Sequence, residues 1–170
     1  MKTVCAWCKM TLVEEPADDT CVSHGICRTC MDRILGASAK EISEFLRTLD
    51  VPVMVLNRNN QVVDLNGLAE KALGMSVAEA KGALAGVAIS CHNAGLPGGC
   101  GLSEHCPGCQ LRRHLLATHA DGQPRLSQIS QHDIVCGGMS RTVRFRFSTQ
   151  KVGEVVVMLI EEMNETLVAS

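Results

Sequence analysis

The chain has 170 residues, of which 46% are hydrophobic and 20% are charged, a length that suits one domain with a small appendage or two small units. Lys and Arg number 16 and Asp and Glu 18, so the net charge of −2 argues against a strongly basic nucleic-acid-binding arm and against an acidic tail. Aromatic residues are too few to favour a protein that stacks nucleic-acid bases; they are Trp7, Phe45, Phe145 and Phe147.

The sequence contains neither a recognisable secretion signal nor a membrane span. A signal peptide has an apolar stretch after its positive residues. The N-terminal MKTVCAWCKM has a positive residue but lacks that stretch. The longest apolar runs, Ala83–Ser90 and Val155–Ile160, fall far short of the roughly 20 residues that cross a membrane. We therefore expect a cytoplasmic protein without membrane association, in which clustered cysteines are metal ligands or redox groups rather than structural disulfides.

The N-terminal segment, residues 1–31, has the cysteine spacing of a zinc-binding unit. Its cysteines are Cys5, Cys8, Cys27 and Cys30. Two Cys-x2-Cys turns separated by eighteen residues can direct four thiolates at one tetrahedral zinc ion. His24 is expected near the ligands or at the surface, and Cys21 belongs to neither turn. We predict a zinc-knuckle, zinc-ribbon-like unit with a structural or protein-contact role, folded mainly by its metal.

The next segment is predicted to be an amphipathic helix over Arg28–Asp50, of which residues 32–50 form a linker. Pro52 prevents the helix from continuing far. Its seam positions alternate in steps of four and three and form about three heptads, interrupted by the small residue Ser38; they are Met31, Leu35, Ser38, Ile42, Phe45 and Leu49. Two interpretations stay open: the helix lies on its own domain, or it pairs with a second copy in a dimer.

A hairpin and two short helices are predicted after the linker. Val51–Asn57 and Gln61–Leu65 are short strands joined by a polar turn. The helix Gly67–Leu73 is ended by Gly74, and Ser76 with Glu79 forms a capping box for the following helix. Residues 82–108 are rich in glycine and are predicted to be loop.

The C-terminal part is predicted to contain one longer helix and three strands. The helix spans Cys109–Ala120, and the strands are Leu126–Val135, Val143–Phe147 and Val155–Ile160. The last of these is apolar and β-branched, as expected for a central strand. Strands segregated from helices predict the α+β class with an antiparallel sheet.

The second cysteine group lies in the glycine-rich loop and comprises Cys91, Cys100, Cys106 and Cys109. Four thiols within nineteen residues can bind one cofactor, either a closed zinc site or an iron–sulfur cluster, and the spacing does not choose between them. A redox dithiol formed by Cys106 and Cys109 is a third interpretation. His92 and His105 flank the group without an assigned role, as does the remaining Cys136.

Residues 46–163 resemble a PAS domain. Asn66 after the hairpin, Leu73-Gly74 at the helix end and Gly82 match the pattern of that family. The cysteine insert, residues 90–110, resembles that of a subset of bacterial sensor PAS domains, and CAWCKM…SHGICRTC resembles a zinc-knuckle segment found beside sensor-kinase domains, with Arg28 in place of a Pro. The resemblance implies a five-stranded antiparallel sheet with flanking helices over residues 51–165.

The resemblance also implies a sensory or regulatory module of bacterial signal transduction, not an enzyme. Its four-cysteine site, iron–sulfur or zinc, would sense redox state or oxygen. No kinase or cyclase segment follows Ile160, so we expect a signal passed through a homodimer, or to a separate histidine kinase or regulator. The alternatives are a structural zinc-binding interaction module without sensing and a thiol oxidoreductase.

Overall fold

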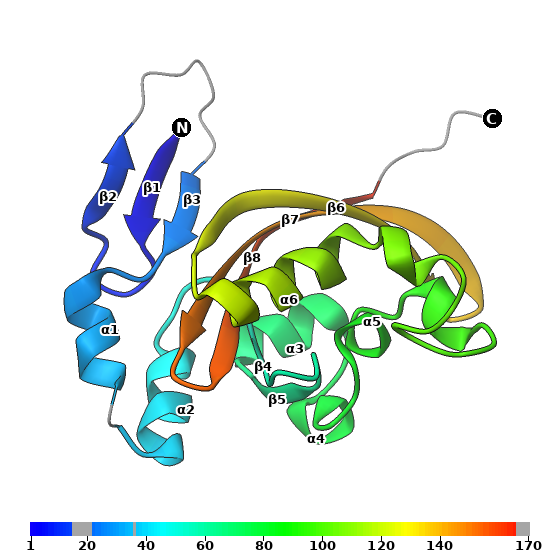
Figure 1. The fold of residues 1–170 in the computed structure, drawn as a ribbon, viewed down its shortest axis with the longest axis horizontal. Coiled ribbons are helices and arrows are strands. Elements are labelled where there is room, and N and C mark those ends of the chain that lie inside the picture. The colour runs from blue at the N-terminus through cyan, green and yellow to red at the C-terminus, as the bar shows by residue number, and fades with distance from the viewer. Residues whose placement is uncertain (15–21, 36, 166–170) are drawn as a thin grey trace.

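The computed structural model describes residues 1–14, 22–35 and 37–165. A small three-stranded sheet stands at one end of the molecule, and a larger, strongly curved five-stranded sheet forms its body (Figure 1). Within these residues no helix is both long and apolar enough to cross a membrane. The small sheet lies within residues 1–31, predicted as a zinc-knuckle unit, and the large sheet lies within residues 51–165, predicted as a PAS-like domain.

The small sheet is built from the residues around the first cysteine group. Its strands are β1 (Lys2–Cys5), β2 (Thr11–Glu14) and β3 (Val22–Gly25), in the order β2-β1-β3. β1 pairs antiparallel with β2 and parallel with β3. This arrangement places the end of β1 beside the end of β3, so the turns that follow the two strands meet.

The predicted helix over Arg28–Asp50 is two helices, α1 (Arg28–Ile34) and α2 (Ala39–Arg47). The single-helix prediction is wrong because Leu35 takes an extended conformation and Ser38 begins a new helix. The Ser38 side chain accepts from the Glu41 N–H, and Glu41 accepts in return from the Ser38 N–H at 2.7 Å, which completes a capping box. The heptad pattern therefore does not describe a continuous helix.

The large sheet has the strand order β5-β4-β8-β7-β6, with every pair antiparallel. Its strands are β4 (Val53–Leu56), β5 (Val62–Leu65), β6 (Arg125–Cys136), β7 (Met139–Val152) and β8 (Val155–Glu165). The predicted hairpin is formed by β4 and β5 at one edge of the sheet, and the apolar strand β8 is its middle strand. This order confirms the predicted α+β class and its PAS-like five-stranded sheet.

Helices cover the concave face of the large sheet (Figure 1). They are α3 (Gly67–Leu73), α4 (Val77–Ala80), α5 (Ala85–Ala88) and α6 (Gln110–Asp121), with 3-10 turns η1 (His92–Gly95) and η2 (Cys106–Gly108). The stops and caps at Gly74 and Ser76 are confirmed. Residues 82–108 were predicted as loop; this was wrong for α5 and the two 3-10 turns, which a period-based method misses because each is shorter than two turns.

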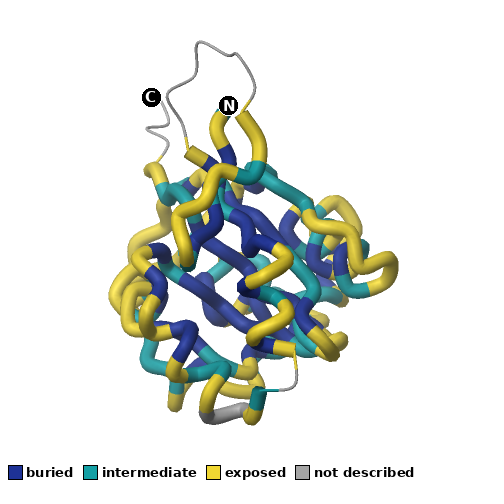
Figure 2. The backbone as a smooth tube through the Cα atoms, turned by 90° about the vertical axis from the view of Figure 1, so that its left-hand side faces the viewer, coloured by how far each residue is buried: buried dark blue, intermediate teal, exposed yellow. Residues whose placement is uncertain are grey.

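Two cores lie on opposite faces of the same strands. On β8, Met158 and Ile160 face the helices, whereas Val157 and Leu159 face away from them, as side-chain alternation requires. The outer core also contains Phe45, Leu46 and Leu49 of the α2 segment. The second half of the linker's apolar stripe is therefore buried against its own domain, whereas Leu35 in the first half is 50% exposed. Figure 2 shows the buried stretches running through the middle of the molecule, with exposed turns around them.

The turn between α6 and β6 gives a prediction of pH dependence. Arg125 donates to both carboxylate oxygens of Asp121, at 3.1 and 2.7 Å, and lowers the pKa of Asp121 from 3.8 to about 2. Because the pKa is lower in the folded state, the contribution to stability is complete above about pH 4 and falls as the pH drops towards 2. We expect Asp121→Asn to have a slightly lower urea midpoint than the parent at pH 6. That difference should shrink between pH 4 and 3; a constant difference would contradict the assignment.

Candidate metal centres

The first cysteine group is gathered in the structure as the spacing predicts. The four sulfurs of the group all lie within 4.8 Å of one another, and those of Cys8 and Cys27 are 3.7 Å apart. A tetrahedral zinc ion with Zn–S bonds of about 2.3 Å requires sulfurs about 3.8 Å apart. Cys8 is exposed, and the other three cysteines are buried. The four residues could therefore hold a metal ion that is almost enclosed.

Main-chain N–H groups point at these sulfurs. The Cys27 N–H donates to the Cys5 sulfur, and the Cys30 N–H donates to the Cys27 sulfur, each at 3.4 Å. Burial raises the pKa of Cys5, but N–H groups of Cys27, Cys8 and Trp7 outweigh it and lower that pKa to about 7. Burial and the neighbouring thiols raise the pKa of Cys30. Four crowded thiols cannot all ionise without a cation, so this environment favours a bound metal ion.

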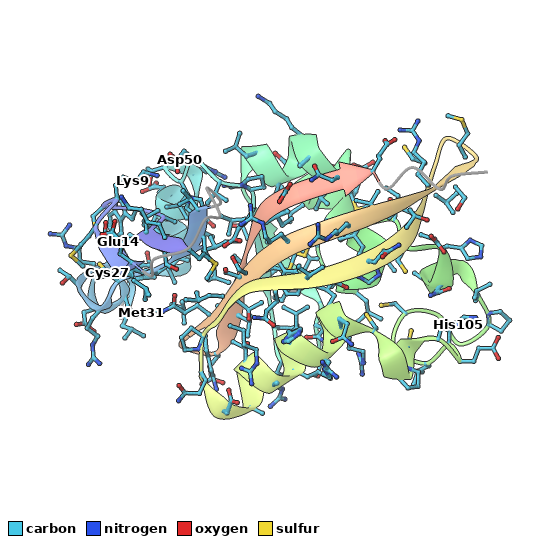
Figure 3. The ribbon with its side chains drawn as sticks, turned by 90° about the horizontal axis from the view of Figure 1, so that it is seen from above. Lys9, Glu14, Cys27, Met31, Asp50 and His105 are labelled. Carbon is cyan, nitrogen blue, oxygen red and sulfur yellow. The ribbon has the colours of Figure 1, made fainter. Side chains whose placement is uncertain are left out.

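The first cysteine turn is attached to helix α2. Trp7, which lies between Cys5 and Cys8, packs against Phe45 with ring centroids 4.0 Å apart. Lys9, just after the turn, forms an ion pair with Asp50 at the end of the linker, and Figure 3 shows both beside the small sheet. The first cysteine turn is therefore in direct contact with the linker.

The second cysteine turn is attached to the outer face of the large sheet. The main-chain N–H and C=O of Ile26 pair with the Gln150 side-chain amide, at 2.9 and 3.2 Å. The Glu161 carboxylate, 1% exposed, accepts from the Ser23 hydroxyl and the His24 N–H at 2.8 Å each. It also accepts from the hydroxyls of Ser127 and Ser148. Sequence reasoning missed this polar interface.

The second cysteine group lines a cavity of about 330 Å³ between the inner face of the large sheet and helices α5 and α6. All four predicted residues contribute to its wall; they are Cys91, Cys100, Cys106 and Cys109. Within the residues that the structure describes, only the N-terminal four cysteines gather their sulfurs within 4.8 Å. The cysteines of the second group therefore surround a cavity, and their sulfurs do not converge on the position of a single ion.

The sulfurs of the second group are held by short local contacts. The Cys106 sulfur lies 3.0 Å from the donating N–H of Gly101 and 3.1 Å from the Ser103 hydroxyl. Burial raises the pKa of Cys106, but these hydrogen bonds outweigh it and lower the pKa. Cys109 is the N-cap of α6, and its sulfur accepts from the Arg112 N–H at 3.4 Å. These contacts stabilise negative charge on sulfur.

His132 of β6 is a further group at this cavity that the sequence did not indicate. It is 8% exposed, and its Nδ1 lies 3.8 Å from the Cys91 sulfur. Its Nε2 lies 2.6 Å from the Ser130 hydroxyl, and the ring packs edge-on against Phe145. The inward-facing alternation of β6 is the only sequence signal that could have placed it here.

The other residues considered from the sequence are scattered. His24 is in β3 outside the gathered cysteines, and burial lowers its pKa. His92 is exposed, and His105 is exposed at the rim of the cavity, beside Glu104. Cys136 is exposed at the end of β6. Cys21 lies outside the described residues. Figure 3 shows Cys27 and His105 at opposite ends of the molecule, so the two cysteine groups are separate sites.

No protein-family model and no curated protein sequence matches the chain. Among solved structures, the PAS domain of Bordetella pertussis BvgS is 14% identical over 75% of this chain and 85% of its own, with a TM-score of 0.43. A domain of a sensory box sensor histidine kinase/response regulator from Geobacter sulfurreducens is 11% identical over 73% and 93%, with a TM-score of 0.48. The PAS domain of the Vibrio parahaemolyticus nitrogen regulation protein NR(II) is 14% identical over 76% of this chain and 100% of its own, with a TM-score of 0.43.

Proposed function

We propose that the chain is a sensory module whose second cysteine group binds a metal cofactor and responds to oxidation. The observation that carries the proposal is that the four cysteines line one cavity against the sheet. The cofactor would be an iron–sulfur cluster or zinc, and the first group would hold a structural zinc ion. Oxidation of the thiolates would release the metal and with it the constraint on the loop.

A route from the cavity to the sheet is present in the contacts of Cys91. Cys91 forms an isolated antiparallel β-bridge with Ile134 of β6. Beside it, the Val135 N–H donates a hydrogen bond to the Ser90 carbonyl at 2.9 Å. A change in the cysteine loop would therefore act on the edge strand β6 and its neighbours β7 and β8. The outer face of β7 and β8 contacts the N-terminal unit and the linker, so the signal would pass to a partner, such as a kinase, a regulator or a second copy, from there.

Hydrogen exchange of the full chain, purified without oxygen and then exposed to air, tests this proposal. We expect faster exchange in residues 90–112, in β6 and at the outer face of β7 and β8. The variant Cys100→Ser, Cys109→Ser should show this faster exchange before exposure and change little afterwards. Exchange that is the same before and after air would overturn sensing and favour the structural zinc-binding module instead.

The lowered pKa of Cys106 favours a second candidate, a thiol oxidoreductase that uses Cys106 and Cys109. Cys106 is only 8% exposed, which restricts attack on a large disulfide substrate. Turnover of a small disulfide by the metal-free chain, abolished by Cys106→Ser, would support this candidate. Reduction no faster than by free thiols would exclude it.

A further inference from the structure

The two cysteine groups differ in how far apart they hold their sulfurs. The N-terminal sulfurs lie within 4.8 Å of one another, which is the arrangement a single tetrahedral ion needs. In the second group no three sulfurs approach one another that closely. A single zinc ion would have to draw these sulfurs together against the turns and the helix that hold them.

The second group nevertheless forms one site. All four cysteines line the same cavity, together with residues of α5, α6 and β6. The volume of this cavity, about 330 Å³, is comparable with a small ligand pocket and far exceeds the space for one ion.

We propose that this cavity holds an iron–sulfur cluster and not a single zinc ion. The inference rests on the proposed function and names the cofactor of that same site. Its thiolate ligands would be Cys91, Cys100, Cys106 and Cys109. A cluster binds its thiolates through separate irons around a core of iron and sulfide, so the ligand sulfurs surround a volume and not a point. The wider separation of the sulfurs and the size of the cavity both follow from this arrangement.

The walls of the cavity suit a negatively charged cluster. Main-chain N–H groups of Gly101 and Arg112 donate to two of the sulfurs, at 3.0 and 3.4 Å. The Arg112 guanidinium lies against Gly101, where an added Cβ would be 2.8 Å from its Nη1. His132 can donate from Nδ1 towards the Cys91 sulfur while Ser130 bonds its other nitrogen. Hydrogen bonds to sulfur and a nearby cation are the groups that adjust the potential of such clusters.

Gly86 of α5 provides a test in which none of the four cysteines is replaced. A Cβ at this position would lie 2.5 Å from the Cys100 sulfur, so Gly86→Ala must displace that sulfur from the cavity. Gly95 of η1 is the matched control, because an added Cβ there meets nothing within 4 Å. Both substitutions add one methyl group to a short helical turn that flanks Cys91, so they differ mainly in the contact with Cys100.

The experiment uses the full chain, stripped of metal and incubated without oxygen with ferrous iron and sulfide, or with zinc alone. After iron and sulfide we expect equal amounts of iron and acid-labile sulfide and a visible absorption band that bleaches in air. A sample given iron and sulfide first and zinc afterwards should in addition hold one zinc ion per chain. Gly86→Ala should lose most of the iron and the band, whereas Gly95→Ala keeps both. Cys27→Ser should lose the zinc ion and keep the iron.

Two zinc ions per chain, with no sulfide retained, would overturn the cluster. Equal iron retention by Gly86→Ala and Gly95→Ala would overturn the assignment of Cys100 as a ligand. Neither result decides the proposed function, because oxidation of zinc-bound thiolates could still change hydrogen exchange. Conversely, a stable cluster whose loss in air leaves exchange unchanged would remove the sensing role and leave the cofactor assignment standing.

Discussion

Replacement of Cys27 by serine is expected to release the N-terminal unit from the large sheet and to lower the zinc content by one ion per chain. Cys27 is 4% exposed and caps α1, where its sulfur accepts from the Cys30 N–H. It directly follows Ile26, whose main chain pairs with Gln150. Structural zinc contributes about 10–16 kcal/mol to the folding of small zinc-binding peptides, so a unit this small cannot remain folded without it.

Hydrogen exchange and zinc analysis of the same sample measure this effect. Amides of β1, β3 and α1 should lose their protection, and the outer face of β8 at Val157 and Leu159 should become accessible to a hydrophobic dye. The inner core should stay protected, because none of its residues comes from the N-terminal unit. Cys136→Ser is the control, since Cys136 is an exposed free cysteine at the end of β6 that belongs to neither cysteine group. A Cys27→Ser chain that keeps its zinc and its protected amides would contradict the prediction.

Local signals in the sequence were sufficient for most of the sheet and for several helix ends. The apolar β-branched run Val155–Ile160 predicts a central strand because only a strand buried on both faces lacks polar alternation. Gly74 and the Ser76 capping box mark helix ends through backbone conformation and hydrogen bonds that depend on near neighbours alone. The Cys-x2-Cys spacing likewise indicates a local turn, whereas the parallel pairing of β1 with β3 is what brings the two turns together.

The contacts between the N-terminal unit and the large sheet could not be predicted in this way. Ser148, Gln150 and Glu161 lie in polar stretches of β7 and β8, residues 148–151 and 161–162, and polar residues of this kind are usually exposed to solvent. They are covered instead by residues more than 120 positions earlier in the chain, such as Ser23 and Ile26. The break at Ser38 was hidden for a related reason, because the heptad pattern reports which side is apolar and not whether the helix is continuous.

The second large effect is expected at this interface, where Glu161→Gln should lower the free energy of unfolding by about 3 kcal/mol. The Glu161 carboxylate is 1% exposed and pairs with Arg146, which is itself 16% exposed. The carboxylate also accepts hydrogen bonds from the His24 N–H and from serine hydroxyl groups of the small sheet, β6 and β7. In the Glu161→Gln variant an NH2 group would replace one of the two carboxylate oxygens. The N–H and O–H groups that bond to that oxygen would then face a hydrogen-bond donor and lose their acceptor.

Glu162→Gln is the matched control for Glu161→Gln. Glu162 is the next residue, pairs with the same Arg146 at 2.9 Å, and differs in being 39% exposed. Water replaces its interactions when the charge is removed, so the cost should be below about 1 kcal/mol. Urea unfolding of both variants in the presence of zinc measures the difference. Equal midpoints for the two variants would show that burial of the Glu161 carboxylate contributes nothing to stability.

The Glu161→Gln variant also separates docking of the N-terminal unit from metal binding. Its substitution lies outside the four cysteines, so zinc content should stay at the parent value while the amides of β3 exchange faster. Cys27→Ser, by contrast, should lose zinc and protection together. If Glu161→Gln also alters how residues 90–112 exchange on oxidation, the outer face of the large sheet is coupled to the cysteine cavity, because Glu161 bonds to Ser23 and Ser148 on the outer face whereas the cavity lies against β6 on the inner one.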